Sequence, residues 1–363
     1  MGKWIGSNEN TVTILPFTDK GFKFITLDCE EYICGYIARG IITMVHDGNK
    51  DALDLITEQE TVDIEIGTVK SGTLLKIHGV ILNRKYFKNK VSIMFHCIPD
   101  IDFYSRRGKL TYTDIDSAIK NLWKGEMEIR TTTDLPSGIE LNQAGEFDYK
   151  YLGVLCGSYK KDTIYAFGLD GLLIKDLIGI DSTGNQEPYR IMLSNGMQVV
   201  QDESDPYDLN YDYKLYRKTN NVWTEDYTDL ESKNLSTIMF DDKYRLVHKD
   251  HSILRDNLLN NQKLYFSRMY GVLIVTNTIQ LLSYRIGDVV YYKRPGEDDK
   301  VPFNTYIISK ISYHFRSEPS NGEPDQFPFE QVFTLHCLEE KGVVMNTEDP
   351  KAEKTDKDIF SDI

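Results

Sequence analysis

The sequence predicts a mainly β protein with α+β insertions. Three observations support this fold class. Segments of the first hundred residues alternate apolar and polar side chains, long strand-like segments follow residue 270, and helix signals concentrate between them. Several strands without intervening helices favour a barrel or a sandwich. We therefore expect two β-rich halves, one at each end of the chain, around an α/β insert.

The first β-rich half is marked by alternation and by turn residues. The segment 61–69 shows the pattern most clearly, because every second residue from Val62 to Ile66 is apolar. The turn pairs Asp47-Gly48, Ser71-Gly72 and Lys88-Asn89 separate the segments. The strands expected here are 11–15, 37–45, 61–69, 74–82 and 91–98.

The insert begins with a helix that we expect to run to about Lys124. Thr113, Asp114 and Asp116 are residues that can cap its start. A second helix is expected after Asn142, which can also act as a cap.

One face of this second helix combines residues at helical spacing, with Gly157 as a C-terminal stop. These residues are Phe147, Tyr151, Leu152 and Leu155. The strands 163–167 and 172–174 then flank Asp170-Gly171, which predicts a hairpin.

The remainder of the chain contains an irregular part and then the second β-rich half. We expect an acidic loop over 201–212 and a helix over 251–263. The segment 317–328 contains three prolines and a glycine, which predicts an exposed loop. The tail 347–363 is charged and poor in large apolar residues, so we expect it to be flexible. The strands expected here are 271–282, 288–293, 304–316 and 329–339.

Composition limits the classes of function. The chain of 363 residues has a formal net charge of −14, which disfavours tight binding to a phosphate backbone. The five cysteines are scattered and odd in number, so we interpret them as small buried residues rather than a disulfide framework. No apolar run is long enough to span a bilayer, and the first ten residues do not have the pattern of a signal peptide.

Catalytic and metal-binding motifs are weak. Asp47, Asn49, Asp51 and Glu58 match positions 1, 3, 5 and 12 of a calcium-binding EF-hand loop, but Ala52 replaces the required glycine. With strands expected on both sides, a polar hairpin loop is the better interpretation.

Other site signatures are also incomplete. His248 and His251 lack a third ligand for zinc, and the paired cysteine spacing of a zinc knuckle is missing. Nucleophile elbows, phosphate-binding loops and dinucleotide fingerprints are absent from the sequence. We expect no catalytic residues, no cofactor and no metal. The 23 tyrosines and 16 phenylalanines suit protein or carbohydrate contact surfaces.

The segment 135–174 carries a resemblance to a known family. It reads LPSGIELNQAGEFDYKYLGVLCGSYKKDTIYAFGLDGLLI and resembles the hub proteins of contractile phage tails, the late-control tail proteins and the type VI secretion spikes. The shared pattern is an amide residue, an acidic-aromatic helix start, a Leu-rich helix, a glycine and a strand with an Asp-Gly hairpin. The matching residues are Gln143, Glu146, Asp148, Tyr149, Leu152, Leu155, Gly157, Asp170 and Gly171.

Further segments are similar to the hub of the large myoviruses. They are 185–189 (NQEPY), 211–213 (YDY), 218–220 (KTN), 285–289 (RIGDV), 304–315 and 329–338. The resemblance implies two β-barrel domains per chain, each resembling a tail-tube subunit. The implied divisions are a first barrel (1–104), an α/β insert (105–207), a discontinuous second barrel (208–218 with 271–345), an inserted lobe (219–270) and a flexible acidic tail (346–363). We expect 208–218 to pair with strands of 271–338.

The resemblance implies a non-enzymatic baseplate hub of a contractile viral tail. A homotrimer presents six tube-like domains to the sixfold tail tube and threefold symmetry to the central spike. The expected partners are other copies of itself, tail tube subunits, the central spike protein, the tape-measure protein and baseplate wedge proteins. DNA would pass during genome ejection without specific binding, and no stable membrane insertion is expected. Assembly would occur in the host cytoplasm, with the virion as the final location. Two alternatives stay open: a carbohydrate-binding or glycan-cleaving tail protein, and a secretion-type spike.

Overall fold

The structure is a computed structural model that describes part of the chain. The described residues are 4–5, 9–33, 35–109, 111–131, 141–143, 145, 147–176, 189–190, 197–202, 211–219, 222–228, 234–241, 257–258, 260–261, 269–292, 304–317 and 329–338.

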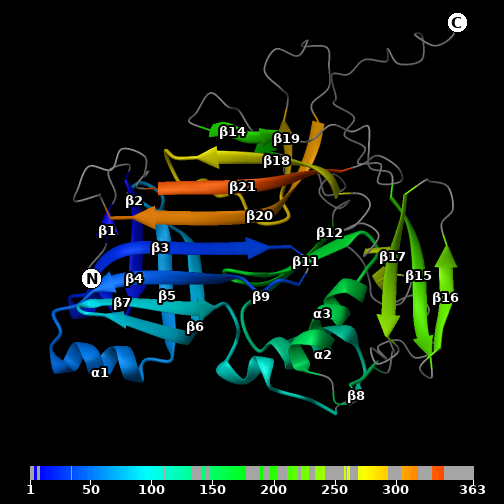
Figure 1. Ribbon diagram of the computed structural model, residues 1–363, viewed down its shortest axis with the longest axis horizontal. Helices are drawn as coiled ribbons and strands as arrows, with labels where there is room; N and C mark the ends of the chain where they lie inside the picture. Colours follow the sequence, from blue (N-terminus) through cyan, green and yellow to red (C-terminus); the bar gives the residue numbers. More distant parts are fainter. Residues whose placement is uncertain are drawn as a thin grey trace, which may run out of the picture.

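Thirteen strands of the described chain form one curled sheet, antiparallel except where β13 pairs with β19 (Figure 1). Its path is β1-β2-β5-β6-β7-β4-β3-β20-β21-β18-β14, with β19 on β20. The strands from the first half are β1 (Trp4–Ile5), β2 (Asn10–Leu15), β3 (Lys23–Tyr32), β4 (Arg39–Val45), β5 (Thr61–Thr68), β6 (Gly72–Phe87) and β7 (Lys90–His96). Those from the second are β13 (Tyr189–Arg190), β14 (Met197–Asp202), β18 (Met269–Asn277), β19 (Val289–Tyr292), β20 (Asn304–Arg316) and β21 (Phe329–Leu338). The mainly β prediction is confirmed.

Alternating side chains explain which face of the sheet is buried. In β5 the residues Val62, Ile64 and Ile66 lie in the core, whereas Asp63 is exposed. The predicted turns at Gly48, Gly72 and Lys88 are confirmed, because all three residues have the positive φ that is common in tight turns. The strand β6 is longer than the predicted 74–82, since it continues to Phe87.

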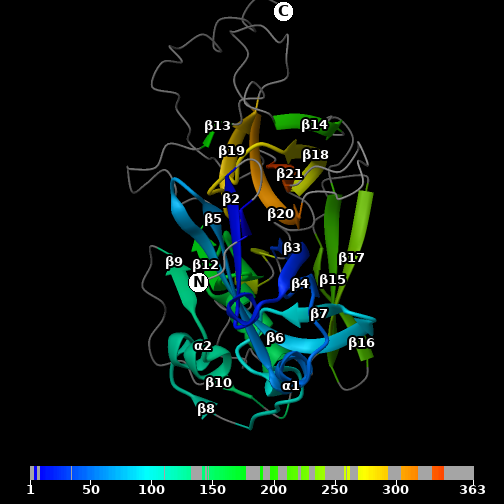
Figure 2. The same cartoon turned by 90° about the vertical axis from the view of Figure 1, so that its left-hand side faces the viewer.

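Strands β3 and β20 join the two β-rich halves. Residues 26–32 pair antiparallel with residues 310–316, so the halves share one hydrogen-bonded sheet. Figure 1 shows β3 and β20 side by side in its middle, and Figure 2 shows the same sheet from its left-hand side, with β2 and β5 crossing the direction of β7.

The insert packs around a second apolar core beneath the sheet. Trp123 stacks on Phe167 there, with ring centroids 5.6 Å apart. The predicted first helix and hairpin are confirmed, and Asp114 caps the helix by accepting from Ser117 N. The elements are η2 (Ile101–Tyr104), β8 (Thr111–Tyr112), α2 (Ile115–Trp123), β9 (Met127–Arg130), β10 (Leu141–Asn142), α3 (Asp148–Ser158), β11 (Thr163–Gly168) and β12 (Gly171–Asp176).

The second insert helix differs in detail from the prediction. Asn142 lies in β10 rather than at the cap, and Phe147 occupies the cap position. Gly157 lies inside the helix, which ends one residue later at Ser158. The predicted face is otherwise confirmed, since Tyr151 and Leu155 are buried.

The expected pairing of 208–218 with 271–338 is wrong. Strand β15 (Tyr211–Thr219) instead pairs with β16 (Val222–Thr228) and β17 (Asn234–Asp241) in a separate three-stranded sheet. Only two residues separate β15 from β16, so the neighbouring segment forms a hairpin before a distant strand can compete. This sheet lies at the right of Figure 1.

The polar hairpin loop expected around Asp47 is also wrong, because a helix begins immediately after it. Helix α1 (Lys50–Glu58) starts where Asn49 Oδ1 accepts a 2.8 Å hydrogen bond from Ala52 N. Asn49 therefore acts as an N-cap, a role that asparagine favours. A short 3-10 turn, η1 (Thr18–Lys20), precedes β3.

Some predictions fall partly or wholly outside the described residues. In the expected helix 251–263, residues Asn257, Leu258, Asn260 and Asn261 are helical and the rest are not described. The segments 318–328 and 347–363, the pair His248 and His251, and the motif residue Glu146 lie outside the described chain.

Candidate functional site

Asp148, the first residue of α3, is the centre of a buried polar network. Its side chain is 7% exposed and accepts from Gln143 Nε2 at 2.8 Å and from Arg106 Nε at 2.6 Å. Arg106 also donates to Asp100 Oδ2 at 2.7 Å and to the carbonyl oxygen of Leu122 at 2.8 Å. The motif residues Gln143 and Asp148 thus join the start of α3 to η2 and to the end of α2.

The glycine of the motif permits a close helix contact rather than a helix end. A Cβ on Gly157 would lie 3.0 Å from Leu258 Cδ1. Asn261, from the same short helical stretch as Leu258, donates to Gly157 O at 2.8 Å and to Lys160 O at 2.6 Å. Its Oδ1 accepts from Thr163 N at 3.2 Å. Gly157 therefore marks the place where Leu258 and Asn261 dock on the insert.

The aromatic and leucine residues of the motif fill the second core. Leu152 and Leu155 are buried, and Tyr149 packs edge-on against Tyr104 with centroids 5.5 Å apart. Tyr104 in turn bonds His96 Nδ1 at 2.6 Å, which connects the insert to β7.

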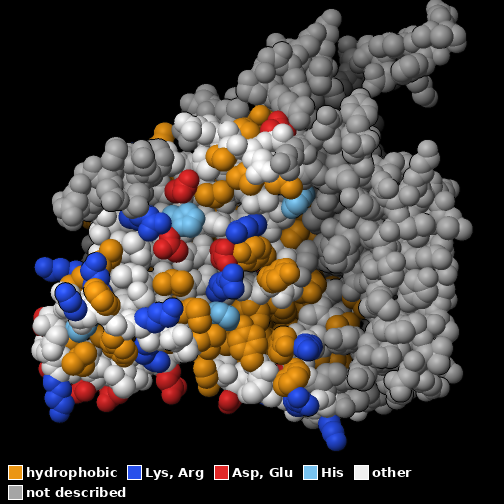
Figure 3. All heavy atoms as spheres, in the orientation of Figure 1, with side chains coloured by type: hydrophobic (Ala, Val, Ile, Leu, Met, Phe, Trp, Pro, Cys, Tyr) orange, Lys and Arg blue, Asp and Glu red, His pale blue; other side chains and the backbone are white. Residues whose placement is uncertain are grey.

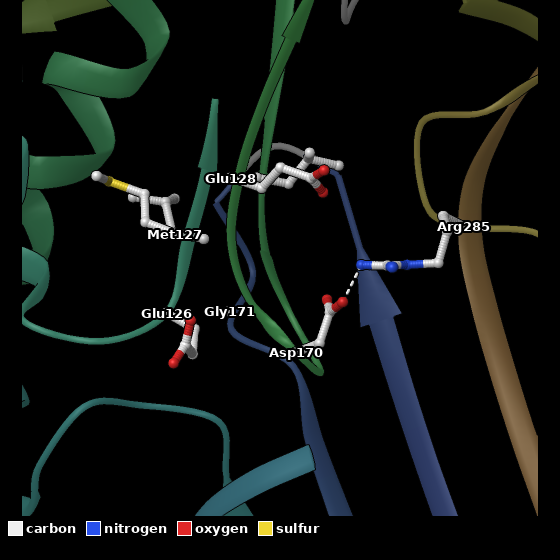
Figure 4. Close-up of a pocket in the computed structure, with 8 residues that line it drawn as sticks. Glu126, Met127, Glu128, Asp170, Gly171 and Arg285 are labelled. Carbon is white, nitrogen blue, oxygen red and sulfur yellow. Dashed lines mark hydrogen bonds and ion pairs between the residues drawn. The ribbon is translucent and has the colours of Figure 1, made fainter. Parts of the chain in front are cut away.

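The hairpin residues Asp170 and Gly171 lie against the second β-rich half. Gly171 has a φ of +128°, and a Cβ there would lie 2.4 Å from Glu126 O, so this turn requires glycine. Asp170 forms an ion pair with Arg285, from the turn before β19 (Figure 4). Arg285 belongs to the segment 285–289, which resembles the hub family, but the sequence does not predict its partner because Asp170 is 115 residues away.

A second ion pair reinforces this connection. Lys175 Nζ donates to Asp288 Oδ1 at 2.8 Å, and both side chains are largely buried. The other oxygen of Asp288 accepts from Arg285 N at 2.8 Å. The buried Lys175 and the partly buried Arg285 are therefore each matched with a carboxylate, which offsets the cost of removing a charge from water.

Glu31 of β3 brings the first β-rich half to the same place. It is 1% exposed, and its carboxylate accepts from Leu169 N at 3.2 Å and from the Tyr313 hydroxyl at 3.3 Å. Burial, followed by the negative charge of Asp170, raises the pKa of Glu31 to about 7, against weaker opposing effects that include the positive charge of Arg285. We call the set Glu31, Asp170, Lys175, Arg285, Asp288 and Tyr313 the three-way junction.

A small pocket opens beside the three-way junction. It has a volume of about 200 Å³ and is lined by Glu126, Met127, Glu128, Asp170, Gly171, Leu172, Leu173 and Arg285 (Figure 4). Glu128 bonds Arg130 at 2.6 Å. Within the described part of the chain, no group of three or more His, Cys, Asp or Glu side chains is placed to hold a metal ion.

The outward face of β4, β3 and β20 carries a ladder of paired charges, which we call the charge ladder. Glu30 bridges Arg39 at 2.8 Å and Lys310 at 3.1 Å. Asp28 bridges His314 at 2.7 Å and Arg316 at 3.3 Å. Figure 3 looks onto this side of the molecule and shows Lys, Arg, acidic and His side chains interspersed there.

Hydrogen bonding in the charge ladder is strong enough to affect titration. Burial acts to raise the pKa of Glu30, but hydrogen bonds from Tyr32, Arg39 and Lys310 outweigh it and lower the pKa to about 2. The face therefore combines residues of both β-rich halves, with its cations held by carboxylates.

Among the residues that the structure describes, no helix is long and apolar enough to cross a membrane. A scan against protein-family models finds no match, and a search of curated proteins finds no relative.

Solved structures do share the fold. A type VI secretion component of E. coli, described as similar to the T4 bacteriophage tail proteins gp27 and gp5, matches 91% of this chain and 77% of its own at a TM-score of 0.51 and 12% identity. A tail protein of Neisseria meningitidis matches over 90% and 96% of the two chains, at a TM-score of 0.56 and 11% identity. A 43 kDa tail protein of prophage MuSo2 from Shewanella oneidensis matches over 91% and 96%, at a TM-score of 0.52 and 8% identity.

A VgrG complex from Francisella also matches, at a TM-score of 0.53 and 12% identity, over 91% of this chain and 58% of that one. The likeness that segment 135–174 and the C-terminal strands indicated thus extends over most of the chain. The chain has the fold of phage tail proteins and of the related type VI secretion proteins.

Proposed function

We propose that this chain is the structural hub of a contractile phage-tail baseplate, a homotrimer that joins the sixfold tail tube to a threefold central spike. The observation that carries the proposal is the pairing of β3 with β20, which places both β-rich halves in one sheet. Two tube-like units per chain become six in a trimer, which matches the tube above, while the threefold axis matches the spike below.

The three-way junction suits a subunit that transmits force. It fixes the β11–β12 hairpin to β3 and to the turn before β19 through ion pairs and a hydrogen bond. Glu31 of β3 in turn accepts from Tyr313 of β20. A rigid junction keeps the two tube-like units in a constant relative orientation. The role we assign to the motif residues is therefore to hold this frame, with no chemistry of their own.

The charge ladder suits the wall of a channel for genome ejection. Unpaired Lys and Arg on such a wall would bind phosphates and slow the DNA. Here Arg39, Lys310 and Arg316 are each held by a carboxylate. We propose that this face lines the channel, past which DNA and the tape-measure protein move. Tail tube subunits, the spike and baseplate wedge proteins occupy the remaining surfaces.

Electron cryo-microscopy of the isolated tail baseplate tests this proposal. We expect three copies of the chain around the tail axis with the charge ladder facing the lumen, at interfaces above about 2,000 Å² in total. A ring of six copies, a dimer, or a ladder turned outward contradicts it. Duplex DNA binding measured near physiological salt gives a second test, and sub-micromolar affinity contradicts the channel role.

A further inference from the structure

The end of the β6–β7 hairpin extends past strand β5 and lies beside β4, because β7 pairs with β4 as far as Lys90 and His46 N donates to Asn89 O at 2.9 Å. Strand β6 pairs with β5 only up to Val80 and then continues with β7 alone to Phe87. Its base is fixed, because the Arg84 side chain donates to the carbonyl oxygens of Ile56 at 2.7 Å and of Gln59, at the end of α1. The end of the hairpin is therefore held in a defined position.

The six residues from Lys85 to Lys90, which we call the hairpin tip, are all exposed. Phe87 is 70% exposed and Tyr86 is 51% exposed. Lys88 Nζ lies 5.8 Å from the centroid of the Phe87 ring. In the part of the chain that the structure describes, none of the three tip lysines forms a salt bridge.

The charge of this segment is opposite to that of the chain. No Asp or Glu occurs between Glu65 and Asp100, whereas the whole chain has 56 acidic and 42 basic residues. An alternative explanation for the lysines is that they protect a sheet edge from aggregation and make no contact with a partner. That explanation does not cover two neighbouring exposed rings, which water solvates poorly and which are typical of contact residues.

We propose that the hairpin tip docks on a carboxylate-rich surface of a second copy of this chain. The formal net charge of −14 makes another copy electrostatically complementary to a segment whose charges are all positive. A tip that binds a different surface of the next copy is a head-to-tail contact, the kind that closes rings. The inference rests on the proposed assembly of several copies and adds the surface that connects them.

The shape of the tip argues against a membrane as the occupant. The two-residue turn Lys88-Asn89 forms the outermost part of the tip. Tyr86 and Phe87 lie behind the turn, on opposite faces of the strand. A membrane anchor would place the rings foremost. On an acidic protein surface the leading lysine meets carboxylates while the rings pack on either side.

Sedimentation equilibrium of the full chain tests the inference. We expect the wild type to self-associate with a Kd that rises with salt concentration. The variant K85E/K88E/K90E should raise that Kd about tenfold or more. The control K20E/K120E/K161E changes three exposed lysines elsewhere, so both variants shift the net charge by the same amount, from −14 to −20 (three changes of −2 each).

Equal weakening in both variants, or no salt-dependent self-association of the wild type, overturns the inference. A second variant, Y86S/F87S, keeps the charge and should also raise the Kd, and circular dichroism confirms that each variant is folded. A photo-crosslinker at position 87 should join two copies of this chain. Tip-dependent binding to duplex DNA or to anionic vesicles in place of a second copy also overturns it.

The outcome is separable from that of the proposed function. If the tip variant still assembles into a trimeric baseplate ring, this inference fails and the hub function stands. If the wild-type baseplate has no ring of copies, both fail.

Discussion

The substitution Glu31→Gln is expected to stabilise the protein above neutral pH. In the folded protein the pKa of Glu31 is about 7, against an ordinary value of 4.5, because burial and the charge of Asp170 disfavour the carboxylate. The unfolded chain therefore releases the proton of this group at lower pH than the folded chain does. The stability contributed by the protonated form is fully present below about pH 4.5 and is lost as pH rises toward 7.

The size of the effect follows from the pKa values. A rise from 4.5 to about 7 corresponds to about 3 kcal/mol, at ~1.4 kcal/mol for each tenfold change. Glutamine cannot ionise and still offers an oxygen to Leu169 N. If one altered hydrogen bond costs about 1 kcal/mol, the variant should be more stable than the wild type by roughly 2 kcal/mol at pH 8.

Urea unfolding followed by tryptophan fluorescence at pH 5, 6, 7 and 8 measures this difference. The gap between variant and wild type should widen as pH rises. Glu30→Gln is the matched control on the same strand. The pKa of Glu30 is lowered from 4.5 to about 2, so its ion pairs stabilise the fold at pH values above 4.5. This contribution is lost as the pH falls toward 2. This control should lower stability at pH 7, by up to about 1 kcal/mol. A gap for Glu31→Gln that stays constant from pH 5 to 8 would refute the reasoning.

Three further predictions concern the fold. Leu155→Ala should cost about 2–5 kcal/mol of unfolding free energy in urea, because Leu155 is 0% exposed; a neutral result would mean that its helix face is not buried. Gly171→Ala should lower the melting temperature by several degrees, because its Cβ would meet Glu126 O at 2.4 Å; an unchanged temperature contradicts the turn geometry. Deletion after Met345 should leave the melting temperature nearly unchanged, because 347–363 is poor in large apolar residues; a large drop would place the tail in the core.

Much of the sheet is predictable because period-two alternation is a local signal. The predicted range 304–316 agrees with both ends of strand β20, and the predicted range 329–339 ends one residue after strand β21. Strand β3 was not predicted, although Leu27 and Cys29 alternate on its core face. The third core-facing residue is Glu31, and a carboxylate at such a position breaks the apolar pattern. Its partner Tyr313 is 282 residues away, a distance at which sequence pattern carries no information.

The candidate site shows the same limit. The resemblance singled out Asp148 and Asp170, and both lie in buried or partly buried networks. Their cations, Arg106 and Arg285, lie 42 and 115 residues away. Alternation and capping rules describe neighbours along the chain, so they do not pair charges across a junction. The domain boundaries, the trimer and the roles of the motif residues stay predictions.

The pairing of β3 with β20 also has a consequence for folding. In register, His314 lies opposite Asp28, 286 residues earlier in the chain. During synthesis β3 emerges long before its partner, so one edge of the first half stays open until most of the chain has left the ribosome. Proteins dominated by such long-range contacts fold slowly, and open edges invite aggregation. We expect refolding of the full chain to be slow and sensitive to protein concentration, and chaperones that cover strand edges to increase its yield.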